Sequence, residues 1–137
     1  MAPIHKRILF VDDEPAIRAT LAVILRRYGF IVTVAATVAE ALHKIKTEQF
    51  DLLLSDLNIE GARDGYTLIR AMRQANPVCV NIILTGYPDE KSVAEGLDLG
   101  IDDYIAKPAN ADALVALLAE KLAGRSKAGT KSSGKIR

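Results

Sequence analysis

Short apolar runs alternate with amphipathic segments along most of this 137-residue chain, and this alternation constrains the fold more than any other feature. Each run has the length of a strand, and each is followed by apolar residues at helical spacing. The runs lie near residues 8–11, 31–34, 52–57, 80–84 and 103–106. Strictly alternating strands and helices imply right-handed crossovers. We therefore predict an α/β fold with a parallel sheet covered by helices on both faces.

Capping residues indicate where several of the helices begin and end. Pro15 suits the first turn of a helix that Gly29 would close. Residues 37–40 have the form of a capping box, and Asn76 before Pro77 would end the third helix. A fourth helix, at about 89–99, has only a thin apolar stripe. The last helix is predicted to end before Gly124.

The composition predicts one folded domain, residues 1–123, and a basic, disordered tail at 124–137. The tail holds five basic residues and no acid. Subtracting them from the net charge of +1 leaves −4 on the body. A mildly acidic domain with a basic tail differs from a uniformly basic nucleic-acid binder, so we expect no specific nucleic-acid binding.

The sequence contains no apolar stretch long enough to span a membrane and no apolar region of a secretory signal at its start. We therefore expect a soluble cytoplasmic protein without membrane contact. Cys79 is the only cysteine, which rules out an internal disulfide and favours a buried, inert thiol.

Four of the five predicted strands end in polar side chains that can bind a metal or a phosphate. Taken singly, each has an ordinary explanation in helix capping, turn formation or solvation. Ligands of open α/β sheets, however, bind at the carboxyl ends of the strands, where these side chains converge. They are Asp12 and Asp13 after the first strand, Asp56 in the third, Thr85 in the fourth and Lys107 in the fifth. The second strand has no such group, which suits an edge position.

These residue types predict phosphate chemistry at a magnesium ion. Three carboxylates brought together repel one another unless a cation lies among them, and a set of oxygen ligands suits Mg²⁺. The ion would neutralise an incoming phosphoryl group and let a carboxylate attack its phosphorus. Lys107 and Thr85 would hold the phosphoryl oxygens. We expect Asp56 to be the phosphate acceptor, since an apolar run too short for a helix ends in this single carboxylate, as a buried parallel strand that delivers one reactive group would.

The chain resembles the receiver domain of bacterial response regulators from about Lys6 to Ala123. The resemblance rests on four motifs in the family's order and at suitable spacing: VDDE at 11–14, DLLLSDL at 51–57, LTG at 84–86 and DYIAKP at 103–108. It implies a flavodoxin-like (βα)5 fold, doubly wound, with strand order 2-1-3-4-5. That order places the first and third strands side by side, and with them Asp12, Asp13 and Asp56.

The resemblance also implies roles for the residues of the metal site. Asp56 would be the phosphoacceptor. Asp13 and Asp56 would bind Mg²⁺ directly and Asp12 through water, and the backbone carbonyl of Asn58 would complete the protein ligands.

The same resemblance implies a switch. Thr85 and Tyr104 match the family's switch pair, in which the hydroxyl moves toward the phosphoryl group and the aromatic ring turns inward. Lys107 matches the family's lysine, and the bond from Lys107 to Pro108 is expected to be cis.

The chain departs from the family pattern in two places. The loop at 58–65 lacks the usual proline and is about a residue longer than the common form. Ala109 stands where many DNA-binding regulators carry Phe, so phosphorylation-dependent dimerisation through the fourth and fifth helices is left open. Asn58 and Tyr87 would flank the path of attacking water and so influence the lifetime of the phosphoryl group.

Three alternatives belong to other classes of protein. A phosphatase of the haloacid dehalogenase type would carry a second Asp two residues after Asp56, where this chain has Asn58. A flavodoxin would need a hydroxyl-rich phosphate loop after the first strand, where acids stand instead. A receiver-like interaction module that is never phosphorylated would typically lack one of the acids or the lysine, and none is missing.

The sequence therefore predicts a receiver of two-component phosphorelay signalling. A sensor histidine kinase or a phosphotransfer protein would donate the phosphoryl group to Asp56, and an unknown downstream protein would read the surface of the fourth helix, fifth strand and fifth helix. The domain would catalyse only its own phosphorylation and dephosphorylation.

Overall fold

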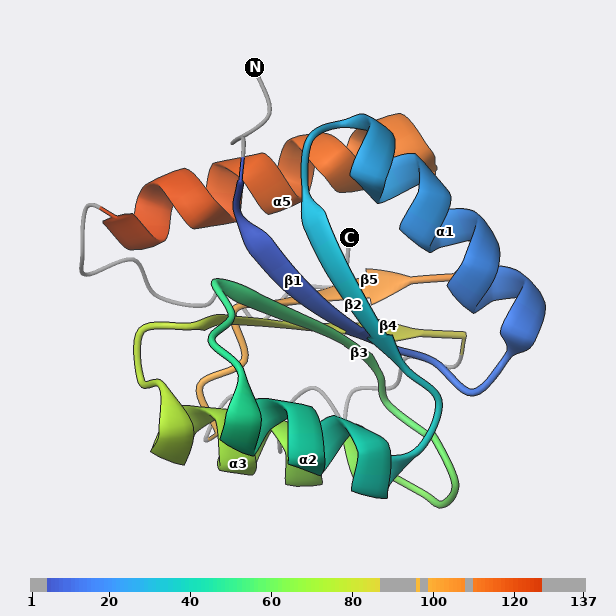
Figure 1. Ribbon diagram of the computed structural model, residues 1–137, viewed down its shortest axis with the longest axis vertical. Helices are drawn as coiled ribbons and strands as arrows, with labels where there is room; N and C mark the ends of the chain where they lie inside the picture. The colour runs from blue at the N-terminus through green and yellow to red at the C-terminus, as the bar shows by residue number, and fades with distance from the viewer. Residues whose placement is uncertain (1–4, 87–95, 97–98, 108–109, 127–137) are drawn as a thin grey trace.

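The computed structural model describes residues 5–86, 96, 99–107 and 110–126, and within them five parallel strands form one sheet. The strand order is β2-β1-β3-β4-β5, as predicted for a flavodoxin-like fold. The strands are β1 (Arg7–Val11), β2 (Ile31–Ala35), β3 (Leu52–Asp56), β4 (Val80–Thr85) and β5 (Asp103–Ala106). Adjacent β1 and β3 make the centre of the sheet, and β2 is an edge, as its lack of a polar end suggested (Figure 1).

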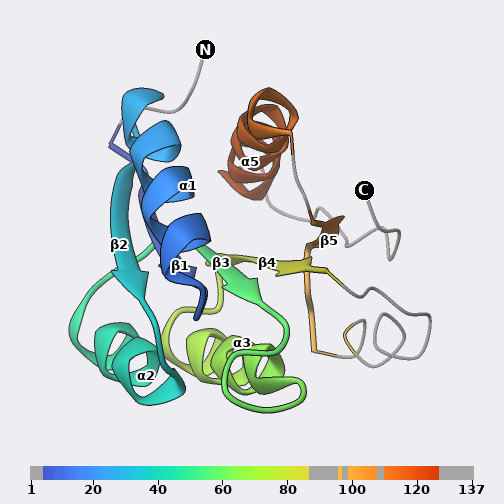
Figure 2. The same ribbon diagram turned by 90° about the vertical axis from the view of Figure 1, so that its right-hand side faces the viewer.

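Helices cover both faces of the sheet. They are α1 (Pro15–Arg27), α2 (Val38–Thr47), α3 (Asp64–Ala75) and α5 (Ala111–Ser126). In Figures 1 and 2, α1 and α5 lie on one face and α2 and α3 lie side by side on the other. Of the helix predicted at 89–99, the structure describes only residues 96 and 99. Tyr87, Pro108, Ala109 and the tail from 127 onward lie outside the described part of the chain.

Local sequence signals place most of the helix ends. Pro15 is the first residue of α1, and Gly29 follows its end with φ 99°, a conformation that glycine adopts without strain. The hydroxyl of Thr37 accepts a hydrogen bond from the Glu40 amide at 3.1 Å, as in a capping box. The carboxylate of Glu40 reaches the amide of Ala36 rather than that of Thr37, so the second half of the box is shifted by one residue.

Gly124 does not end the last helix, contrary to the sequence prediction, because α5 continues to Ser126. A glycine inside a helix costs only about 1 kcal/mol relative to alanine. The preceding turn is held to the sheet by buried Leu122 and by an ion pair of 3.5 Å between Lys121 and Asp103. Tertiary contacts therefore outweigh the weak local signal.

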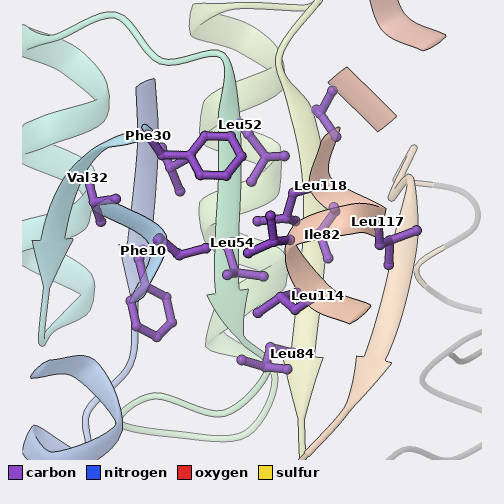
Figure 3. Close-up of a cluster of buried hydrophobic side chains, with 14 of the residues drawn as sticks. Phe10, Phe30, Val32, Leu52, Leu54, Ile82, Leu84, Leu114, Leu117 and Leu118 are labelled. Atoms are coloured by element: carbon purple, nitrogen blue, oxygen red, sulfur yellow. The ribbon is translucent and has the colours of Figure 1, made fainter. Parts of the chain in front are cut away.

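Two hydrophobic clusters, one on each face, hold the helices to the sheet. Successive residues of a strand point to opposite faces, so Leu52 and Leu54 pack toward α1 and α5, while Leu53 packs toward α2 and α3. Figure 3 shows Leu52, Leu54 and Ile82 of the sheet beside Leu114 and Leu118 of α5. Every residue of β3 and β4 is buried, which explains why these strands read as continuous apolar runs. The sheet is therefore a rigid base for the groups at its carboxyl edge.

Among the described residues, no helix is both long enough and apolar enough to cross a membrane.

Candidate phosphoacceptor and metal site

Three carboxylates converge where β1 and β3 end. The register pairs Val11 with Ser55, so the residues that follow, Asp12 and Asp56, lie at the same edge of the sheet. One carboxylate oxygen from each of Asp12, Asp13 and Asp56 lies within 4.8 Å of the other two. Asp12 is fully buried, Asp56 is nearly so, and Asp13 is exposed. The strand order thus brings together the acids that the sequence placed on separate strands.

Lys107 supplies the cation of this cluster. It follows β5, and its Nζ donates hydrogen bonds to Oδ2 of Asp12 at 2.8 Å and to Oδ2 of Asp56 at 3.2 Å. Its backbone amide donates to the carbonyl of Thr85 at 2.8 Å, which fixes the start of the side chain against β4. Residues at the ends of β1, β3 and β5 therefore meet in one ion-paired group.

Asp12 is the most firmly held of the acids. Its Oδ1 accepts from the Glu14 amide at 2.9 Å, which leaves Oδ2 to Lys107. The guanidinium of Arg18 donates to the backbone carbonyl of Asp12 at 2.8 Å. This contact of Arg18 was not predicted from the sequence. Its signal was available, because a basic residue in the first turns of the helix that follows an acidic strand end can reach back toward that end.

The charges around Asp56 are unbalanced. Burial raises the pKa of the Asp56 carboxyl above its ordinary value, Lys107 lowers it, and the charges of Asp12 and Asp13 raise it again. Burial acts to lower the pKa of Lys107, but its hydrogen bond to Asp12 and the charges of Asp56 and Asp12 outweigh burial and raise it. A single ammonium thus serves more than one carboxylate, and burial adds to the raised pKa of Asp56. The three carboxylates of Asp12, Asp13 and Asp56 therefore carry more negative charge than Lys107 alone neutralises.

The donor set fits a hard divalent cation. Carboxylate oxygens at this spacing suit Mg²⁺, which takes oxygen ligands and keeps several waters. A second cation beside Lys107 would also offset the burial and the repulsion by Asp12 and Asp13 that raise the pKa of Asp56. Asp12, Asp13 and Asp56 are thus the residues that could hold the ion, with the backbone at Asn58 next to them in sequence.

The loop after β3 is held by its own side chains in place of the proline it lacks. The amides of Glu60 and Gly61 donate to Oδ2 of Asp64 at 2.9 and 2.6 Å, and the Arg63 amide donates to Oδ1 of Asn58 at 2.7 Å. Arg63 adopts a left-handed conformation with φ 62°. The carboxylate of Glu60 also accepts from the amide of Val38, at the first turn of α2. The longer loop is therefore an ordered turn that is fastened to α2.

Gly65 lets this loop return close to the acceptor. A Cβ at Gly65 would lie 2.5 Å from the carbonyl oxygen of Asp56 and 3.1 Å from Cα of Leu57. The Gly65 amide donates to the carbonyl of Leu57 at 2.8 Å. A side chain here would push the start of α3 away from the end of β3, so glycine sets the position of the backbone around Asp56.

The predicted switch residues Thr85 and Tyr104 lie on the neighbouring strands β4 and β5. Thr85 ends β4 and is buried, and Tyr104 is buried in the cluster that faces α3. The strand register pairs Ile83 with Tyr104 and Thr85 with Ala106. Because alternate residues share a face, Thr85 and Tyr104 lie on the same face of adjacent strands. The structure thus places the predicted pair as diagonal neighbours.

An open hollow of about 640 Å³ borders the site between α1 and α5. Its walls are mainly apolar, and Lys107 lines it together with Glu14 at the start of α1. The site therefore has room for a partner group on this side.

Comparisons with known proteins agree with this geometry. The family model of the response regulator receiver domain matches residues 8–119, most of the chain. The chain belongs to the response regulator receiver domain family, whose members work in two-component systems. The phosphatase and flavodoxin alternatives are thereby set aside.

Two curated proteins show what the chain is similar to. It is 37% identical over 110 residues to the transcriptional activator protein IrlR of Burkholderia pseudomallei, covering 80% of this chain and 47% of that protein. It is 36% identical over 116 residues to the acid tolerance regulatory protein ActR of Sinorhizobium medicae, covering 85% and 59%. The chain thus spans about half the length of these curated relatives.

Solved structures give the same picture. A CheY-like receiver domain from Methanospirillum hungatei has a TM-score of 0.85 and 36% identity, with 91% of this chain and 99% of that chain covered. A response regulator from Burkholderia pseudomallei with a phosphorylated aspartic acid, a calcium ion and citrate has a TM-score of 0.78 and 30% identity, with 89% and 71% covered.

Proposed function

We propose that Asp56 accepts a phosphoryl group from a phosphohistidine, in a reaction that needs Mg²⁺. The observation that carries the proposal is the group formed by Asp12, Asp13 and Asp56 with the Lys107 ammonium 3.2 Å from Asp56. A related response regulator with a phosphorylated aspartic acid and a calcium ion supports it by analogy.

The reaction forms one bond and breaks another. An Asp56 carboxylate oxygen attacks phosphorus, a P–O bond forms, the P–N bond breaks, and the histidine nitrogen leaves with the electron pair. Asp12, Asp13 and Asp56, with the Asn58 carbonyl, would hold Mg²⁺, which would supply charge neutralisation for the phosphoryl oxygens. Lys107 contributes a second positive charge, and its contact with Asp12 keeps it at the site.

The partners follow from this chemistry. The donor is a sensor histidine kinase or a phosphotransfer protein, which places the domain in the cytoplasm. The phosphorylated state is read by a protein through the surface near β5 and α5. IrlR is a transcriptional activator, and about half of its length lies outside the match, so a DNA-binding output would reside there rather than in this domain.

We infer that the phosphoryl group acts on the output surface through Thr85 and Tyr104. In the phosphorylated state, the Thr85 hydroxyl moves toward the phosphoryl group, and the Tyr104 ring stays in its buried position. In support, both side chains are buried on the same face of adjacent strands. Thr85→Ala should leave phosphorylation of Asp56 measurable while signalling to the output partner is lost. If signalling persists in that variant, this route is wrong.

Phosphorylation by acetyl phosphate tests the proposal. Intact-mass spectrometry of the natural chain should show one added phosphoryl group with Mg²⁺ and none with EDTA. Asp56→Asn should abolish the addition. Asp51→Asn is a matched control, because Asp51 lies at the opposite end of β3, where it binds the Arg7 amide. No addition to the folded natural chain would favour a receiver-like interaction module that is never phosphorylated.

A further inference from the structure

Two tyrosine hydroxyls meet inside the protein. The hydroxyl of Tyr66, in α3, lies 2.6 Å from that of Tyr104, in β5, and either oxygen can donate the hydrogen bond. Both residues are almost fully buried, at 2% and 1% exposure. Each belongs to the hydrophobic cluster between the sheet and α2 and α3. A hydrogen bond in such surroundings is shielded from competing water.

Gly96 leaves the space that the Tyr104 hydroxyl occupies. A Cβ at Gly96 would lie 1.6 Å from that hydroxyl oxygen and 2.8 Å from Cζ of the same ring. The backbone at Gly96 is outside the left-handed region, so alanine could adopt its conformation. Glycine at position 96 therefore leaves space for the Tyr104 ring, and the local backbone conformation does not require it.

Tyr66 is also tied to the acceptor through the chain itself. It directly follows Gly65, which packs against the carbonyl of Asp56, and its amide donates to the carbonyl of Arg63 at 3.0 Å. Tyr66 thus joins the loop after β3 to the ring of Tyr104. This connection does not involve Thr85, which is a diagonal neighbour of Tyr104 on the adjacent strand.

We propose that Tyr66 is a positioning residue that stabilises the buried position of the Tyr104 ring through the bond between their hydroxyls. This inference rests on the proposed function, in which that ring is part of the switch. Because Tyr66 lies on α3 rather than among the phosphoryl-binding groups, its effect is present whether or not Asp56 is phosphorylated. A neutral hydrogen bond changes an equilibrium by roughly 2- to 10-fold in net terms. The tyrosine pair would therefore set how readily phosphorylation completes the switch.

Tyrosine-to-phenylalanine variants of the full chain test this role. The natural chain, with its tyrosine rings labelled with ¹³C, is studied by NMR with Mg²⁺, and a soluble gadolinium chelate broadens the signals of exposed rings. The signal lost in Tyr104→Phe identifies the Tyr104 ring. Tyr66→Phe removes one hydroxyl, and Tyr28→Phe is the matched control, because Tyr28 hydrogen-bonds Asp112 between α1 and α5.

We expect Tyr66→Phe to lower the ratio of buried to exposed Tyr104 ring by roughly 2- to 10-fold, and the Tyr28 variant to leave it unchanged. Gly96→Ala should make the exposed position dominant. A ratio in the Tyr66 variant equal to that of the natural chain would overturn the proposal. If the Tyr66 variant does not fold, Tyr104→Phe with labelled phenylalanine examines the same bond from its other side: increased exposure of the ring at position 104 supports the proposal, and unchanged burial overturns it.

These measurements use unphosphorylated protein, so they separate this inference from the proposed function. A chain that acetyl phosphate does not modify, but whose Tyr104 ring responds to Tyr66→Phe, would refute phosphorylation of Asp56 and retain the tyrosine pair. A chain that is modified, but whose ring does not respond, would give the opposite result. If both hold, Tyr66→Phe should also weaken binding of the phosphorylated chain to its output partner by a similar factor.

Discussion

The ammonium of Lys107 lies between two buried carboxylates, 2.8 Å from Oδ2 of Asp12 and 3.2 Å from Oδ2 of Asp56. One positive charge therefore serves an acidic cluster that also includes Asp13. A divalent ion bound to the same carboxylates would be repelled by Lys107, and the two cations would compete for the negative charge.

Replacing this lysine should therefore strengthen magnesium binding. In Lys107→Met the site loses one positive charge, and at an effective dielectric constant near 20 a charge several ångströms away contributes on the order of 1–3 kcal/mol. We expect the Kd for Mg²⁺ to fall about fivefold or more, as measured by isothermal titration calorimetry, while phosphorylation by acetyl phosphate becomes slower. Lys121→Met is the control, because its ion pair with Asp103 lies at the other end of β5. Unchanged affinity in the Lys107 variant would show that the ion binds elsewhere.

Without a divalent ion, the protein should become less stable as pH rises through the pKa of Asp56. That pKa is raised in the folded state by burial and by Asp12 and Asp13, despite Lys107. The folded state therefore binds the proton more tightly than the unfolded state. The resulting contribution is fully present below the unfolded pKa and is lost as pH rises through the folded pKa.

In EDTA at pH 7, Asp56→Asn should consequently raise the free energy of unfolding by on the order of 1 kcal/mol, a few degrees in Tm. Urea unfolding at several pH values measures both effects. The natural chain should lose stability relative to the Asn variant as pH rises from about 4, the ordinary pKa of an aspartic acid, through the raised pKa of Asp56. A variant less stable than the natural chain in EDTA would contradict the charge imbalance inferred for the site.

Gly65 and Gly61 offer a paired test of the loop after β3. A Cβ at Gly65 meets the Asp56 carbonyl at 2.5 Å, whereas the nearest atom to a Cβ at Gly61 lies at 3.6 Å. Gly65→Ala should therefore destabilise the protein by about 1–3 kcal/mol, the usual cost of overpacking, and should slow phosphorylation, because the backbone around Asp56 must shift. Gly61→Ala should change stability by less than about 0.5 kcal/mol. Similar effects of the two substitutions in thermal unfolding would contradict the close approach at Gly65.

Asp64 should be required for the ordered form of the same loop. Its Oδ2 accepts from two backbone amides, those of Glu60 and Gly61. Asp64→Ala leaves both without this partner and should lower stability by about 1–2 kcal/mol. It should also weaken Mg²⁺ binding, since the Asn58 carbonyl proposed as a ligand lies in this loop. Calorimetric titration of the variant checks this, and an unchanged Kd would argue against a ligand from the loop.

The fold was predictable because its signals are local and repeated. The apolar runs that became β3 and β4 are buried on both faces, and Pro15, Gly29 and Thr37 stand at real helix ends. Asp12, Asp13, Asp56 and Lys107 were predictable as one group because parallel strands bring their carboxyl ends to one edge of the sheet.

What the sequence did not predict depends on contacts between distant segments. The end of α5 was misplaced because burial of Leu122 outweighs the local signal of Gly124. The Tyr66 hydroxyl meets Tyr104 across 38 positions, and no spacing rule links residues of α3 and β5. The Arg18 contact and the loop held by Asp64 likewise depend on backbone positions that only the folded chain defines.

Trapping the phosphorylated residue tests the central claim most directly. After treatment with acetyl phosphate and Mg²⁺, sodium borohydride reduces an aspartyl phosphate to homoserine, which tandem mass spectrometry locates in the digested chain. The account predicts homoserine in place of Asp56 and unmodified aspartate at positions 12 and 13, with no homoserine when EDTA replaces Mg²⁺. Homoserine at either of those two positions, or at none, would contradict the assignment of Asp56 as the phosphoacceptor.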